Sequence, residues 1–138
     1  MSETAKDVAK QWYAAVHAGD FDGLFGLMAE DCVIEYYGPS VIPFAGVYRG
    51  KETCKAFFGH VANDVEIALF RQDEFIADGD LVAVTGRLEM KLKATGRDYA
   101  SEYAHVLTIR DGKVARFRDF QDTAQALHVS LDIATPQR

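Results

Sequence analysis

The spacing of apolar residues changes along the chain, from a helical period near the start to an alternating pattern after residue 65. A first helix is expected after Thr4 or Ser2 as the cap, ending at Ala18-Gly19. A second helix is expected to begin after Asp20 and to end near residues 29–31. The remaining elements expected in the first half are a short strand at 32–37, an irregular stretch at 38–50 and a third helix at 51–61 that ends at Asn63-Asp64.

The alternating second half predicts a series of strands separated by short glycine-containing turns. Their expected ranges are 65–76, 81–93, 99–110 and 113–121. Helices followed by a meander of strands predict an α+β fold, a cone-shaped barrel in which the N-terminal helices pack on a curved, mostly antiparallel sheet. A cone of that kind encloses a pocket. The tail at 132–138 is expected to be loosely ordered.

The turn between the last two predicted strands decides which side chains share a face. A three-residue loop, Arg110-Asp111-Gly112, would pair residue 109 with residue 113. This register places His105 opposite Phe117 and diagonal to Asp119, all on one face. A two-residue Asp-Gly turn would instead put His105 and Asp119 on opposite faces. We favour the three-residue loop because it also gathers the apolar residues of the other face.

Composition narrows the class of protein. A chain of 138 residues, 49% of them hydrophobic, fits one domain over residues 1–138 with one core. Its net charge of −6 argues against nucleic acid or an anionic membrane as the main partner. The first residues lack an apolar signal region and no apolar run is long enough to span a membrane, so a cytoplasmic protein is expected. Cys32 and Cys54 are isolated among apolar neighbours and are expected to be reduced, buried thiols.

Four stretches resemble the SnoaL-like branch of the nuclear transport factor 2-like superfamily, also called the ketosteroid isomerase-like fold. They are Ala14–Asp22, Ala29–Glu35, Gly46–Glu52 and Arg110–Val114. The resemblance covers nearly the whole chain and implies the cone fold. It is a poor guide to reaction, because this fold hosts isomerases, cyclases, dehydratases, hydrolases and non-catalytic modules.

Ketosteroid isomerases of this fold use a tyrosine and two aspartates. The matching positions here hold Trp12, Tyr36 and Ala104, so the set is absent. SnoaL-type polyketide cyclases carry an acid/base aspartate on the last strand and a histidine on the strand before it. Asp119 and His105 match these positions, and a carboxyl group in an apolar pocket can move a proton next to a carbonyl.

Limonene-epoxide hydrolases of this fold suggest an alternative, water addition by a carboxylate, arginine and carboxylate group. Arg87, Glu89 and Asp119 would supply that group. Periodicity is against it, because Leu88, Met90 and Leu92 form the apolar face of their strand and would send Arg87 and Glu89 to solvent.

The leading hypothesis is therefore a cofactor-free isomerase, cyclase or lyase that binds a small apolar or aromatic molecule. Asp119 would be the general acid/base, and His105 would orient it or stabilise an oxyanion. A non-catalytic ligand-binding or dimerisation module remains a third reading. The expected walls of the pocket are Trp12, Tyr36, Tyr103 and Phe117. No metal site is expected, because no histidine, cysteine and acid set has ligand spacing. A homodimer through the outer face of the sheet is expected.

Overall fold

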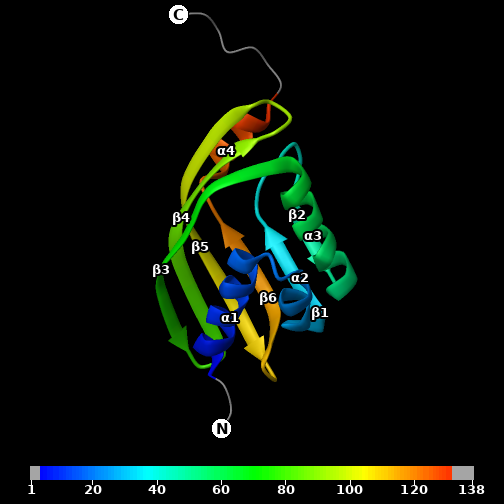
Figure 1. Ribbon diagram of the computed structural model, residues 1–138, viewed down its shortest axis with the longest axis vertical. Coiled ribbons are helices and arrows are strands. Elements are labelled where there is room, and N and C mark those ends of the chain that lie inside the picture. The colour runs from blue at the N-terminus through cyan, green and yellow to red at the C-terminus, as the bar shows by residue number, and fades with distance from the viewer. Residues whose placement is uncertain (1–3, 132–138) are drawn as a thin grey trace, which may run out of the picture.

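The computed structural model describes residues 4–131, so Ser2 and the tail expected to be loose at 132–138 lie outside the described residues. Three helices lie against one face of a six-stranded sheet, and a fourth lies at the opposite end of the molecule from the N-terminus (Figure 1). The helices are α1 (Ala5–Ala18), α2 (Phe21–Gly26), α3 (Lys51–Asp64) and α4 (Thr123–Ser130). The strands are β1 (Met28–Tyr36), β2 (Gly46–Arg49), β3 (Val65–Asp78), β4 (Leu81–Leu92), β5 (Arg97–Arg110) and β6 (Lys113–Phe120).

The sheet is mixed, curved and not closed into a full barrel, with strand order β2-β1-β6-β5-β4-β3. Every neighbouring pair is antiparallel except β1 and β6, which run parallel. The pairing of β3 with β4 slips at two places, between Ile67 and Leu69 and between Gln72 and Glu74. Bulges of this kind bend a strand and increase its twist, which helps β3 to sweep across the front of the molecule. The expected α+β fold is confirmed.

Helix α1 begins and ends where the sequence predicts. Thr4 and Asp7 form a reciprocal capping box, and Gly19 closes the helix in the left-handed conformation with φ of 65°. The buried residues of this helix are Val8, Ala9, Trp12 and Tyr13. Trp12 and Tyr13 therefore both face the sheet, which brings two aromatic side chains to the centre of its concave face.

The second helix is shorter than expected. It ends at Gly26 rather than near residues 29–31, and β1 begins already at Met28 rather than at Cys32. Two glycines, Gly23 and Gly26, weaken so short a helix, whereas Met28 is buried when it joins the sheet.

Two elements were not predicted from the sequence. The stretch expected to be irregular contains β2, which pairs antiparallel with β1. After the last strand, Asp122 caps α4 by accepting a hydrogen bond from the backbone N–H of Gln125.

The predicted register of the last hairpin is wrong, although the face that it predicted is right. The turn has two residues, Asp111 and Gly112, both with positive φ, and Arg110 pairs with Lys113. A bulge then follows, because Ile109 pairs with Val114 while the preceding Thr108 pairs with Arg116. A two-residue turn alone would have put His105 and Asp119 on opposite faces of the sheet. The extra residue of the bulge on β6 returns them to the same face. As a result His105 lies directly opposite Asp119 rather than diagonal to it.

The core fills the space between the helices and the concave face of the sheet. Its largest fully buried side chains include Trp12, Tyr36, Leu24 and Leu107. Cys32 and Cys54 are both buried and free, as expected, and the Cys54 thiol donates to the carbonyl of Cys32. Within residues 4–131, no helix combines the length and the apolar character needed to cross a membrane.

Candidate active site

His105 on β5 and Asp119 on β6 form a buried pair on the concave face of the sheet. His105 Nε2 lies 3.2 Å from Asp119 Oδ1. The two residues are only 3% and 5% exposed. Their positions follow from the antiparallel pairing, because directly opposite residues of two strands project from the same face. Burial among apolar side chains strengthens such a contact, since little water competes for it.

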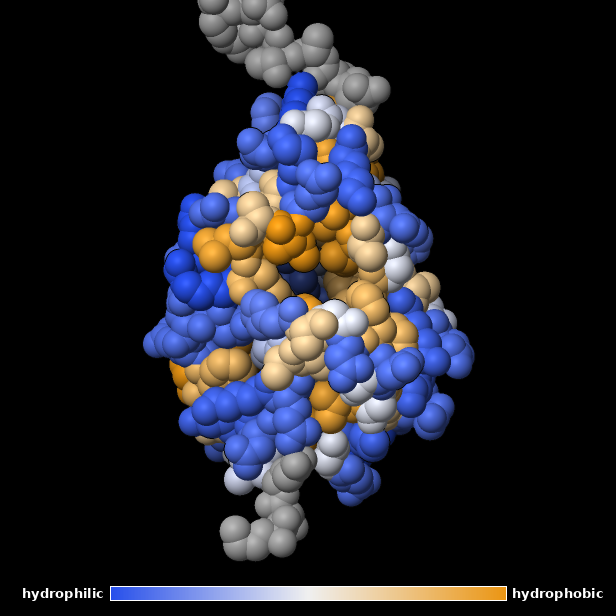
Figure 2. Space-filling view, viewed as in Figure 1, coloured by the Kyte–Doolittle hydropathy of each residue, from blue (hydrophilic) through white to orange (hydrophobic). Residues whose placement is uncertain are grey.

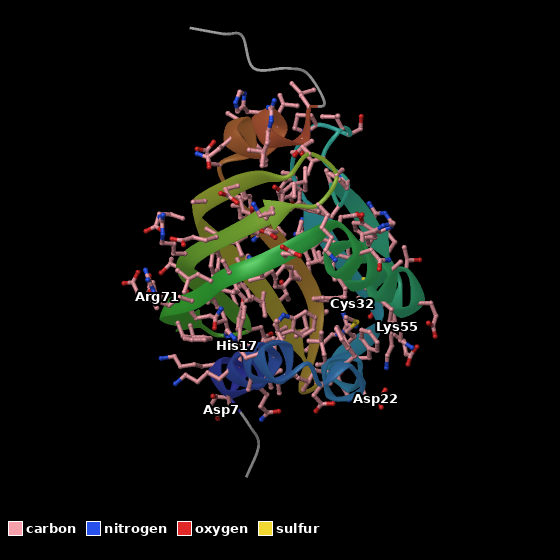
Figure 3. All side chains as sticks on the ribbon, turned by 45° about the horizontal axis from the view of Figure 1, so that its top comes forward. Asp7, His17, Asp22, Cys32, Lys55 and Arg71 are labelled. Carbon is pink, nitrogen blue, oxygen red and sulfur yellow. The ribbon has the colours of Figure 1, made fainter. Side chains whose placement is uncertain are left out.

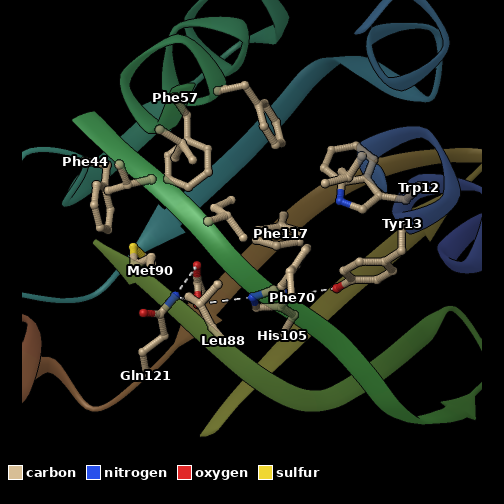
Figure 4. Close-up of a pocket in the computed structure, with 16 residues that line it drawn as sticks. Trp12, Tyr13, Phe44, Phe57, Phe70, Leu88, Met90, His105, Phe117 and Gln121 are labelled. Carbon is tan, nitrogen blue, oxygen red and sulfur yellow. Dashed lines mark hydrogen bonds and ion pairs between the residues drawn. The ribbon is translucent and has the colours of Figure 1, made fainter. Parts of the chain in front are cut away.

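Tyr13 on α1 holds the other side of the imidazole. Its hydroxyl oxygen lies 2.6 Å from His105 Nδ1 (Figure 4). Because an ionised Asp119 can only accept, its partner Nε2 must carry the ring proton, and Nδ1 of a neutral imidazole then accepts from the phenol. Burial raises the pKa of Tyr13 well above its ordinary value, so the phenol keeps its proton. Tyr13 therefore fixes the tautomer in which His105 donates to Asp119.

Gln121 on the far side of Asp119 completes the arrangement. Its amide nitrogen donates to both carboxylate oxygens, at 3.0 Å to Oδ1 and 3.1 Å to Oδ2. The amide oxygen accepts from the hydroxyls of Tyr99 at 2.8 Å and Tyr36 at 3.4 Å. These two donors fix which way the amide points. Oδ1 accepts two hydrogen bonds and Oδ2 only one, so Oδ2 keeps a lone pair for a ligand.

Asp119 opens onto an apolar cavity of about 100 Å³. Figure 2 shows the mouth as a hollow near the middle of this face, rimmed by hydrophobic side chains. The cavity lies between α1, α3 and the concave face of the sheet, and its aromatic lining residues are Trp12, Tyr13, Phe44, Phe57, Phe58, Phe70 and Phe117. A cavity of similar size, about 150 Å³, admits benzene in another protein. The space therefore suits an aromatic ring, with the mouth leaving room for a longer ligand to extend outward.

The cavity carries almost no charge. His105 and Asp119 are the only members of its lining, among the described residues, whose side chains belong to the His, Asp, Glu, Lys and Arg classes. Charged residues such as Asp7, Asp22, Lys55 and Arg71 lie instead at the periphery (Figure 3). An anionic ligand would find no cation in this lining, and burying an unpaired charge is costly. The cavity therefore favours an uncharged ligand.

Arg87 and Glu89 do not join this site. They pair with each other at 2.8 Å on the opposite face of β4, and Arg87 also lies 3.5 Å from Glu102 on β5. Their side chains are 36% and 42% exposed. The inward neighbours Leu88 and Met90 line the cavity in their place. The three-residue group required for water addition is therefore not formed around Asp119, because strand alternation sends two of its members outward.

The four expected wall residues divide into two pairs. Trp12 and Phe117 line the cavity and stack on each other with ring centroids 5.6 Å apart. Tyr36 and Tyr103 are buried but are not part of the lining. Tyr36 supports Gln121 from behind, whereas Tyr103 stacks on His105 with ring centroids 4.3 Å apart. Both act on the site through a residue that does line it.

Sequence reasoning did not predict the roles of Tyr13 and Gln121. Alternation along the predicted strand at 113–121 puts Gln121 on the face of Asp119, but nothing in the sequence pattern shows that its amide meets the carboxylate. Tyr13 follows Trp12 on a helix whose apolar stripe is wide enough for adjacent residues. Its position next to Trp12 on that stripe was the one feature of the sequence that pointed to Tyr13. Among residues 4–131, no group of three or more histidines, cysteines or acids is arranged to hold a metal.

Tyr103 gives the fold a dependence on alkaline pH. Its hydroxyl donates to the carbonyl of Arg71 at 2.8 Å and accepts from the Gln72 amide at 3.0 Å. Burial raises the pKa of Tyr103 to about 12 from an ordinary value of 10.0. At pH values below the ordinary pKa, the phenol is protonated in both the folded and the unfolded chain. Between the two values the unfolded chain loses this proton while the folded chain keeps it, so the free energy of unfolding falls as pH rises.

Tyr103→Phe tests this dependence. The variant should be less stable than the wild type by about 1 kcal/mol near neutral pH, because two hydrogen bonds are lost. The difference should narrow at about pH 11, where the wild type alone loses the stability linked to this phenol. Urea unfolding followed by circular dichroism at several pH values measures it. A difference that stays constant with pH would show that Tyr103 titrates alike in both states.

The fold and the site define a class of protein. Helices covering the concave face of a curved six-stranded sheet, with a pocket between them, make this an NTF2-like α+β protein. A solved NTF2-like protein from Burkholderia xenovorans LB400 superposes with a TM-score of 0.85 and 29% identity, over 94% of this chain and 98% of that one. A family model described as a SnoaL-like domain matches residues 9–117. The chain belongs to the SnoaL-like domain family.

Two further structures are similar. TerC, co-crystallised with polyporic acid, has a TM-score of 0.76 and 26% identity, with 91% of this chain and 97% of that chain covered. A candidate polyketide cyclase from Pseudomonas putida KT2440 has a TM-score of 0.75 and 20% identity, with 93% and 98% covered, and at that identity it shows the fold alone. No curated protein matches the sequence significantly.

Proposed function

We propose that this protein is a cofactor-free proton-transfer enzyme, an isomerase, cyclase or lyase that acts on a small uncharged carbonyl compound. One observation carries the proposal. A carboxylate with a free lone pair lies inside an apolar, ring-sized cavity, and it is held there by donors on both sides. Such a carboxylate can still accept a proton from a molecule bound in the cavity.

Asp119 is the general base in this proposal, with Oδ2 as the accepting atom. It takes a proton from a carbon next to the ligand carbonyl. The electrons of the broken C–H bond form a carbon–carbon double bond, and the carbonyl π electrons move to oxygen. Asp119 then returns the proton to the same carbon or to another atom of the ligand, which regenerates the carboxylate. Positioned acid/base groups of this kind typically contribute about a hundredfold to ten-thousandfold in rate.

His105 and Gln121 position the carboxylate rather than exchange protons with the ligand. His105 donates to one carboxylate oxygen and Gln121 to both, which keeps Asp119 pointed into the cavity, and Tyr13 holds His105 in the donating tautomer. Preorganised donors avoid the reorganisation that water would require when the charge on Asp119 changes. The surrounding aromatic rings exclude water that would compete with the carbon acid.

The SnoaL-like family supports this class of function without identifying the substrate, and TerC, a neighbour at 26% identity, was crystallised with polyporic acid. A non-catalytic ligand-binding module would use the same cavity. A measurement of catalysis, rather than of binding alone, is therefore needed to distinguish an enzyme from a binding module. The homodimer expected through the outer face of the sheet stays a prediction.

Deuterium exchange at an enolisable aromatic ketone tests the proposal. We choose 2-tetralone in D2O, followed by proton NMR, because the protons beside its carbonyl exchange through an enolate. The protein should accelerate this exchange above the buffer rate, and tetralin, which has the same ring skeleton without the carbonyl, should inhibit it. Quenching of the fluorescence of Trp12, the one tryptophan of the chain, reports binding separately. A ketone that binds but exchanges only at the buffer rate would leave ligand binding as the function.

A further inference from the structure

Trp12 carries a hydrogen-bond donor that the protein itself does not use. Trp12 is 1% exposed, yet no other described residue accepts a hydrogen bond from its indole N–H. Within residues 4–131, Arg118 Nε is the only fully enclosed side-chain nitrogen or oxygen without a partner. The indole N–H is therefore unpaired but not sealed, and the open space beside Trp12 is the cavity that it lines.

The direction of this donor is fixed by packing. Phe58 meets the indole edge to face with ring centroids 5.8 Å apart, and Phe117 stacks against it. Figure 4 shows the indole nitrogen on the edge of Trp12 that is turned toward the inside of the pocket. A donor held in place and left without an acceptor costs about 1 to 3 kcal/mol when it is removed from water. A ligand acceptor would recover that cost.

The donor and the base line the same cavity, and both lie near Phe117. Trp12 stacks on Phe117, and Asp119 is two residues further along β6 on the same face, about 7 Å from Phe117 at the backbone. A ligand in this cavity can therefore present its carbonyl oxygen to Trp12 and the C–H bond beside that carbonyl to Asp119.

We infer that Trp12 Nε1–H binds the carbonyl oxygen of the ligand and so sets its orientation toward Asp119. The inference rests on the proposed function, and it narrows the ligand to uncharged aromatic ketones in which the carbonyl and the acidic proton are on neighbouring atoms. An indole N–H donates but does not accept. Trp12 therefore stabilises the negative charge that builds on the oxygen when Asp119 removes the proton, and it does not itself transfer one.

The single tryptophan makes the inference directly measurable. A 1H–15N spectrum of the full chain contains one indole cross-peak, which belongs to Trp12. Saturating 2-tetralone should move the indole proton downfield, because a new hydrogen bond deshields it. Tetralin should fill the cavity without that shift. An equal shift with the two compounds would overturn the inference and leave Trp12 as a wall, and failure of either compound to bind would overturn the ligand class.

Matched variants give a second measurement. Trp12→Phe keeps an aromatic wall and removes the donor, so its affinity for 2-tetralone should fall by about 3- to 10-fold relative to tetralin, as expected for one hydrogen bond. Phe58→Leu contacts the same ring without removing a donor, and it should change both affinities alike. Equal losses for the two ligands in Trp12→Phe would also contradict the inference.

The outcomes separate this inference from the proposed function. A downfield indole shift without accelerated exchange would support the hydrogen bond from Trp12 and contradict proton transfer by Asp119. Accelerated exchange that depends on Asp119, with the same indole shift for 2-tetralone and tetralin, would support proton transfer and contradict the hydrogen bond from Trp12.

Discussion

Replacing Asp119 by Asn lowers the rate of proton exchange at a bound ketone by about a hundredfold or more, as expected for the loss of a general base. The substitution keeps the size of the side chain, and its amide oxygen can still accept from His105 Nε2. Binding of 2-tetralone should therefore persist while exchange falls toward the buffer rate. Deuterium exchange and tryptophan quenching measured on the same samples give the two quantities independently.

Glu89→Gln is the matched control for Asp119→Asn. It removes one carboxylate from the outer face of β4, where Glu89 pairs with Arg87 rather than with the cavity. The exchange rate should not change. If Asp119→Asn retains the wild-type rate, Asp119 is not the base. If Glu89→Gln loses the rate, the group on the outer face has a role that the geometry does not account for.

Replacing Gly86 by Ala is expected to cost about 3 kcal/mol of folding free energy, because the position is already filled. A Cβ there would lie 1.8 Å from the backbone carbonyl oxygen of Arg71 and 2.5 Å from the hydroxyl of Tyr103. Neither group can move freely, since Tyr103 donates to that same carbonyl. Relief would have to separate β3 from β4 or displace Tyr103, which stacks on His105.

Gly59→Ala provides the comparison for Gly86→Ala. Gly59 lies on the exposed side of α3, and an added Cβ meets no atom within 4 Å. This change should raise stability by up to about 1 kcal/mol, because alanine favours a helix over glycine. Chemical denaturation of the two variants against the wild type measures both effects. A Gly86→Ala protein as stable as the wild type would mean that β3 can shift at little cost.

The site was predictable where strand alternation decides it. His105, Phe117 and Asp119 were placed on one face from alternation and an assumed turn, and the structure has them there. The turn itself was not predictable, because Asp111-Gly112 suits a two-residue turn as well as a longer loop. Choosing between them required the bulge, which depends on how Val114 and its neighbour pack against the rest of the core.

Arg87 and Glu89 show the opposite case. Periodicity alone sent them to solvent, whereas a family resemblance drew them into a hypothetical hydrolytic group. The structure follows periodicity, because the apolar neighbours Leu88 and Met90 are buried in the cavity wall. Tyr13 and Gln121 could not be assigned by either route. Their hydrogen bonds cross 92 residues in one case and depend on two tyrosines that hold an amide in the other.

The bulge at residue 115 also affects how related sequences should be aligned. Two chains can share the same turn glycine and the same final strand, yet differ by one residue between them. If an alignment runs through that point without a gap, it equates Asp119 with a residue that faces outward in a relative without the bulge. A missing acid in such a comparison would then reflect a shifted count rather than a lost side chain. Relatives of this protein should be aligned from Arg116 forward when their last strand is searched for a counterpart of Asp119.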